Sequence, residues 1–137
     1  MPSAIDQAIQ VRLIATAPGP QAVPAVLHYH PDDPFAVRIS FPPEISLDGA
    51  EVDWIFARDL LASGLAAPAG QGDVRVEPAG RSRTLMEFHV PDGVAMVQMR
   101  TEDLHCFLER SYQAVPAGQE DAHLHLDGDL TELFGAA

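Results

Sequence analysis

Residues Trp54–Leu65, WIFARDLLASGL, decide the fold because the spacing of apolar side chains changes within them. The first three continue an alternation that begins at Val52, which is the spacing of one face of a strand. The apolar residues after Arg58 follow helical spacing instead. They are Leu60, Leu61 and Leu65. Asp59 suits the positive end of a helix dipole, and Gly64 suits a helix end. The stretch therefore predicts a strand that passes directly into a helix over residues 57–65.

Upstream of this stretch, three runs of alternating apolar and polar residues predict three more strands. Turns rich in proline separate these runs. The alternating apolar positions are Ile9, Val11, Leu13 and Ala15; Val23, Ala25, Leu27 and Tyr29; and Phe35, Val37, Ile39 and Phe41. Because proline cannot donate a hydrogen bond to a neighbouring strand, Pro24 predicts an edge position near the start of the second run.

Downstream, the same order of strands followed by a helix is repeated. Alternation over residues 73–77 and 84–90, and an apolar run over 94–99, predict three strands, the last in a central position. Pro91-Asp92-Gly93 predicts a hairpin turn between the last two. Thr101 is positioned to cap a second helix, and a short final helix is predicted from about 127 to 134. This order predicts a single α+β domain over residues 1–137, with antiparallel sheets.

Composition limits the kinds of partner that this chain can have. It carries 20 acidic residues and 8 basic ones, all arginine, for a formal net charge of −12. Such a chain repels the phosphate backbone of nucleic acids and attracts basic partners. Residues 1–10 lack the basic segment and long apolar run that predict a secretory signal, and no apolar run approaches the ~18 residues that span a bilayer. We therefore expect a cytoplasmic protein without membrane insertion.

Candidate chemical sites are weak. The pairs His28/His30 and His123/His125 could each share a strand face and hold zinc, but neither CxxC nor HExxH accompanies them. Cys106 follows His105, and adjacent helical residues point about 100° apart, so we expect a small buried cysteine and no activated thiol. We therefore predict no catalytic residue, no metal site, no cofactor and no enzymatic activity.

Two apolar features could serve either the core or an interface. Trp54, the only tryptophan, is expected to anchor the core, with an interface role as the alternative. The final predicted helix carries an apolar stripe that either packs on its own domain or docks on a neighbouring subunit. The residues of this stripe are Leu130, Leu133 and Phe134.

Two stretches resemble the central block of the SsgA-like proteins, which are sporulation and cell-division regulators of filamentous actinobacteria. These are residues 54–65 and 70–78, the latter GQGDVRVEP. Flanking segments fit in the same order, among them residues 33–37, DPFAV, and 107–110, FLER. The resemblance thus covers nearly the whole chain.

The resemblance implies a non-enzymatic protein that acts in septum-site selection at the division septum. It implies two antiparallel sheets with helices, similar to the whirly-type nucleic-acid binders, and assembly as a trimer. The shortness of the chain favours the branch of the family that recruits the tubulin-like division protein FtsZ. Arg58 or Arg75, both within the resembling stretches, is hypothesised to contribute to an interface. The alternative function is a whirly-like single-stranded nucleic-acid binder, which requires a basic groove with stacking aromatic residues.

Overall fold

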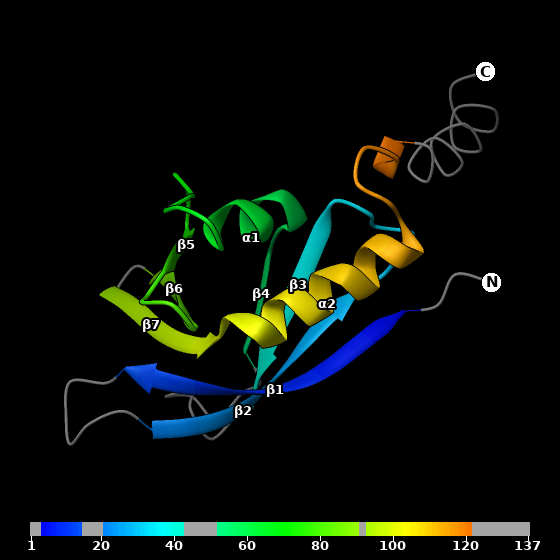
Figure 1. The fold of residues 1–137 in the computed structure, drawn as a ribbon. Helices are drawn as coiled ribbons and strands as arrows, with labels where there is room; N and C mark the ends of the chain where they lie inside the picture. Colours follow the sequence, from blue (N-terminus) through cyan, green and yellow to red (C-terminus); the bar gives the residue numbers. More distant parts are fainter. Residues whose placement is uncertain (1–3, 15–20, 43–51, 91–92, 122–137) are drawn as a thin grey trace.

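The fold is built on one antiparallel sheet curled around two helices (Figure 1). The computed structural model describes residues 4–14, 21–42, 52–90 and 93–121. Within these ranges the elements, in chain order, are β1 (Ile5–Ile14), β2 (Gln21–Tyr29), β3 (Ala36–Phe41), β4 (Val52–Ala57), α1 (Arg58–Gly64), β5 (Val74–Pro78), β6 (Arg83–Val90), β7 (Gly93–Arg100) and α2 (Thr101–Ala114). The strand order across the sheet is β4-β3-β2-β1-β7-β6-β5. The predicted order of strands and helices is thus confirmed as far as residue 121.

The expectation of two separate sheets is wrong for the described residues, because β1 serves both halves. One edge of this ten-residue strand pairs with β2, from Ile5 to Leu13. The opposite edge pairs with β7 over its last four residues, from Val11 to Ile14. A long strand with partners on both edges therefore joins what would otherwise be a four-stranded and a three-stranded sheet.

The two halves of the sheet nevertheless face each other across the core. The ring of Phe88 in β6 lies 5.1 Å from that of Trp54 in β4 and 5.7 Å from that of Phe41 in β3, centre to centre. Strands at opposite ends of the sheet order therefore share one interior, and the expected core role of Trp54 is confirmed. Helix α1 connects the two edge strands directly, since β4 precedes it and β5 follows it.

Helix α2 lies across the curled sheet (Figure 1) and buries one apolar stripe. Leu104, Phe107 and Leu108 recur three and four residues apart, and all three are buried. Cys106 lies off this stripe and is exposed, so the expectation of a buried cysteine is wrong. The predicted capping role of Thr101 is wrong, because Arg100 is the N-cap and Thr101 is the first residue of α2. The Thr101 hydroxyl instead lies 2.8 Å from the Thr84 hydroxyl, which ties α2 to β6.

The predicted central position of residues 94–99 is confirmed, whereas the edge position predicted at Pro24 falls in an internal strand. β7, which contains residues 94–99, lies between β1 and β6 and is therefore internal. β2 is also internal, but its described pairing with β3 covers only Val26 to His28. Pro24 lies before that pairing begins, so its missing N–H costs no hydrogen bond to β3.

Candidate partner-binding surfaces

Arg58 begins α1 and is buried, with 1% of its surface exposed. Its backbone N–H donates to the carbonyl of Phe35 at 2.7 Å. This hydrogen bond extends the pairing of β3 with β4 to the first residue of α1. Its Nη2 donates to the Glu120 carboxylate at 2.7 Å, and its Nη1 donates to the carbonyl of Val115 at 2.8 Å. Nη1 also lies within hydrogen-bond distance of both Ser111 oxygens. The guanidinium thus holds the segment after α2 against the start of α1.

Two tyrosine rings enclose the same guanidinium. Its central carbon lies 5.0 Å from the ring centre of Tyr29 and 4.6 Å from that of Tyr112, both within cation–π range. Burial raises the pKa of Tyr29 to about 12, although the nearby Arg58 charge acts in the opposite direction. Burial also raises the pKa of Tyr112. Both phenols therefore stay neutral at physiological pH, and that of Tyr29 donates to the carbonyl of Pro34 at 2.9 Å.

We call Arg58, Glu120, Tyr29, Tyr112 and Ser111 the Arg58 centre. The direct hydrogen bond from Arg58 lowers the pKa of Glu120, and the carboxylate also accepts from the backbone N–H of Gly118 at 2.8 Å. Every described contact of Arg58 is internal, so this side chain supports the fold in the isolated chain. Arg58, which the sequence suggested as an interface residue, can therefore influence partner binding only indirectly, through the segment after α2 that it holds in place.

Arg75 is placed differently, with its side chain exposed on the edge strand β5. It lies opposite Glu87 of β6 in the strand register. Among the described residues it forms no ion pair. Arg75 is therefore accessible to a partner, as an interface role requires. The other predicted interface residues, Leu130, Leu133 and Phe134, lie outside the described residues.

The opposite edge of the sheet carries an exposed apolar side chain. Ile55 of β4 is 66% exposed, and its neighbours in the strand, Trp54 and Phe56, turn toward the core. Phe35, just before β3, is 41% exposed. Edge strands present unpaired backbone groups, so an exposed isoleucine there is a candidate contact with another chain. Sequence alternation could have indicated this position, because Ile55 interrupts the polar face of its strand.

The histidine pair on β2 and the following turn is engaged in local hydrogen bonds. His28 Nδ1 lies 2.7 Å from an Asp6 carboxylate oxygen, and its Nε2 lies 3.1 Å from the Ser40 hydroxyl. His30 accepts a hydrogen bond from the backbone N–H of Asp32. Over the part of the chain that the structure describes, no three His, Cys, Asp or Glu side chains come together as metal ligands. His123 and His125 lie outside that part.

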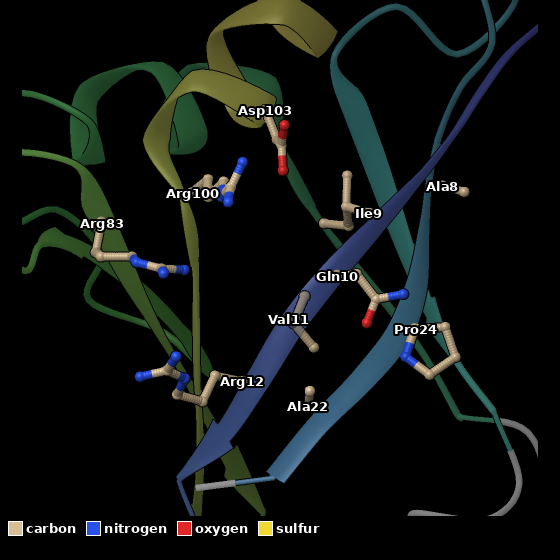
Figure 2. Close-up of a pocket in the computed structure, with 10 residues that line it drawn as sticks. All are labelled: Ala8, Ile9, Gln10, Val11, Arg12, Ala22, Pro24, Arg83, Arg100 and Asp103. Atoms are coloured by element: carbon tan, nitrogen blue, oxygen red, sulfur yellow. The ribbon is translucent and has the colours of Figure 1, made fainter.

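A third surface is a hollow of about 540 Å³ beside β1 (Figure 2). Arg12, Arg83 and Arg100 extend toward it from three different strands, and Asp103 lies at one end. The hollow forms where β7 ends and turns into α2, which leaves Ala8 to Gln10 of β1 without described partners on that side. This gathering of arginines was not anticipated from the sequence.

Comparison with known proteins shows what kind of chain this is. The family described as "Streptomyces sporulation and cell division protein, SsgA" matches residues 23–120. The chain belongs to the SsgA family. The resemblance found in the sequence is thereby confirmed. In the described parts of this family member, no helix is long and apolar enough to cross a membrane.

Relatives of this SsgA-family chain are similar over nearly its whole length. The sporulation-specific cell division protein SsgB of Kineococcus radiotolerans is 42% identical over 134 residues, which cover 94% of this chain and 79% of that protein. SsgB of Streptomyces coelicolor is 38% identical, with 98% of each chain covered. Among solved structures, the SsgA-like sporulation-specific cell division protein of Thermobifida fusca superposes with a TM-score of 0.85 at 34% identity, over 96% of each chain. The structure reported for SsgB in a study of longitudinal cell division during sporulation of S. coelicolor gives 0.78 at 35% identity, over 88% of this chain and 95% of that one.

Proposed function

We propose that this SsgA-family chain is a non-enzymatic regulator of sporulation-specific cell division that helps select septum sites by binding other proteins, and that it recruits FtsZ. The observation that carries the proposal is the similarity to SsgB over nearly the full length of both chains. Because that similarity covers 98% of each chain, the proposal concerns the whole fold and not one segment of it. The proposed site of action is the cytoplasmic face of the future septum.

The described surfaces favour binding over catalysis. The exposed side chains that could contact a partner are Arg75 on β5 and Ile55 on β4, at opposite edges of the sheet. The titratable groups with shifted pKa belong to the Arg58 centre, where they are enclosed by one another. We propose that the β5 edge, which carries Arg75, contacts the division partner. The β4 edge, which carries Ile55, would support assembly as a trimer together with the apolar C-terminal residues.

Charge reversal of Arg75 tests the partner-binding part of this proposal. In co-sedimentation with FtsZ polymers, Arg75→Glu is expected to bind at least about tenfold more weakly than the wild type, because like charges brought together at an interface oppose binding. Arg110→Glu is the matched control, since Arg110 is also an exposed arginine but lies on α2, away from both edge strands of the sheet. Sedimentation velocity of the same samples reports assembly, and a trimer is expected for all three proteins.

Two results would contradict the proposal. If the wild-type chain does not pellet with FtsZ polymers, direct recruitment is wrong. If Arg75→Glu and Arg110→Glu both bind as the wild type does and remain trimeric, Arg75 is not an interface residue.

A further inference from the structure

Half of the chain's arginines gather where β1, β6 and β7 meet the start of α2. Arg83 of β6 lies directly opposite Arg100 of β7, and Arg12 of β1 lies opposite Gln98, two residues before Arg100 on the same face. Arg81 adjoins them, since it lines a neighbouring hollow together with Arg83 and Arg100. We call Arg12, Arg83 and Arg100 the arginine hollow (Figure 2). These side chains form one positively charged surface across three adjacent strands.

This concentration of charge is unfavourable in the unbound chain. Like charges directly opposite each other on paired strands destabilise a sheet. None of the three arginines forms an ion pair with a described residue, although the chain has 20 acidic residues against 8 basic ones. Asp103 lines the hollow, but its carboxylate makes no described ion pair either. An anion bound between Arg83 and Arg100 would remove the repulsion between them.

We propose that the arginine hollow binds a short acidic segment of a partner protein. Arginine guanidinium groups pair with carboxylates in a bidentate geometry, and three of them at strand spacing can take successive Asp or Glu side chains. Beside the arginines, the hollow is lined on β1 and β2 by the small side chains of Ala8, Ala22 and Pro24, which leave space for a peptide backbone (Figure 2). The inference goes beyond the proposed function, because it holds whether or not FtsZ is the partner.

The same residues disfavour a nucleic acid as the ligand. Among the described residues that line the hollow, none is an aromatic side chain on which a base could stack. The net charge of −12 repels a long polyanion, and Asp103 places a negative charge at one end of the hollow. A short peptide carries fewer negative charges than a nucleic-acid strand and is therefore repelled less by the net charge of the chain.

Fluorescence anisotropy with a labelled peptide of about eight residues, mostly glutamate, tests the proposal on the full chain. Arg83→Gln/Arg100→Gln is expected to weaken binding at least about tenfold, since each lost charged hydrogen bond contributes about that factor. The matched control, Arg38→Gln/Arg110→Gln, removes the same charge from exposed positions outside the hollow and is expected to change binding less than about twofold. The melting temperature of Arg83→Gln/Arg100→Gln should be no lower than that of the wild type, because the double variant loses a repulsive pair of charges.

Each other outcome overturns the inference. It is wrong if the peptide does not bind, or if both double variants lose affinity equally, which would show a response to net charge alone. It is also wrong if an oligothymidine strand or inorganic phosphate binds more tightly than the peptide through the same two arginines. If Arg83→Gln/Arg100→Gln changes the sedimentation of the chain without peptide, the arginine hollow is occupied by a second copy of the chain and not by a different partner. Failure here with normal FtsZ co-sedimentation leaves the proposed function intact, and the converse result leaves the hollow intact.

Discussion

Replacing Arg58 with methionine is expected to lower the free energy of unfolding by about 3–5 kcal/mol, because it leaves the carboxylate of Glu120 buried without its cation. Methionine fills much of the same space between Tyr29 and Tyr112, so the loss reports the charge and its hydrogen bonds more than packing. Urea unfolding followed by circular dichroism at pH 7 measures the change.

Glu120→Gln and the double variant separate the ion pair from the rest of the Arg58 centre. If the pair is coupled, the double variant is less destabilised than the sum of the two single variants. The pH dependence has a fixed sign: the folded-state pKa of Glu120 is lowered, so its stabilisation is present above the ordinary value of 4.5 and is lost as pH falls through the lower folded-state pKa. A wild-type chain whose acid unfolding matches that of Glu120→Gln would contradict this account.

Gly64→Ala is expected to destabilise the fold by about 3 kcal/mol, at the upper end of the range for overpacked sites. A β-carbon at Gly64 would lie 2.3 Å from the Val76 Cβ and 2.8 Å from the Val76 carbonyl oxygen. The latter atom is backbone and is held by a hydrogen bond from Ala69 at 2.8 Å, so it cannot easily move. Glycine at the end of α1 is thus what lets the helix pack closely on β5.

Gly72→Ala is the matched control, because a β-carbon there would meet no atom within 4 Å. Its thermal and urea unfolding should stay within about 0.5 kcal/mol of the wild type, as surface substitutions usually do. Equal stability of the Gly64 and Gly72 variants would show that α1 does not pack against β5 as described.

The strands were predictable because the alternation of apolar and polar side chains within each strand is enough to identify it. Their partners were not, because pairing between β1 and β7 joins residues more than 80 positions apart, such as Val11 and Met99. Alternation identifies the buried face of a strand but not the strand beside it, so one sheet and two sheets look alike in sequence. Exposure of Cys106 could have been predicted, since it lies off the stripe that Leu104 and Phe107 define.

The candidate surfaces were less visible in the sequence. Burial of Arg58 depends on Glu120, which lies 62 positions later in the chain. No local sequence pattern predicts such a pair. A weak signal existed, since Arg58 lies among the apolar residues of a strand end and a helix start. The arginine hollow had a stronger one: a hairpin, predicted from Pro91-Asp92-Gly93, pairs residues at equal distances on either side of it, and Arg83 does lie opposite Arg100.

Time-lapse imaging of a functional fluorescent fusion during sporulation, with the division ring labelled in the same cells, tests the central claim most directly. The account predicts ladders of foci at future septa that appear before the FtsZ ring or together with it. A fusion that follows the nucleoid, or that stays diffuse until after rings have formed, would contradict a role in selecting septum sites.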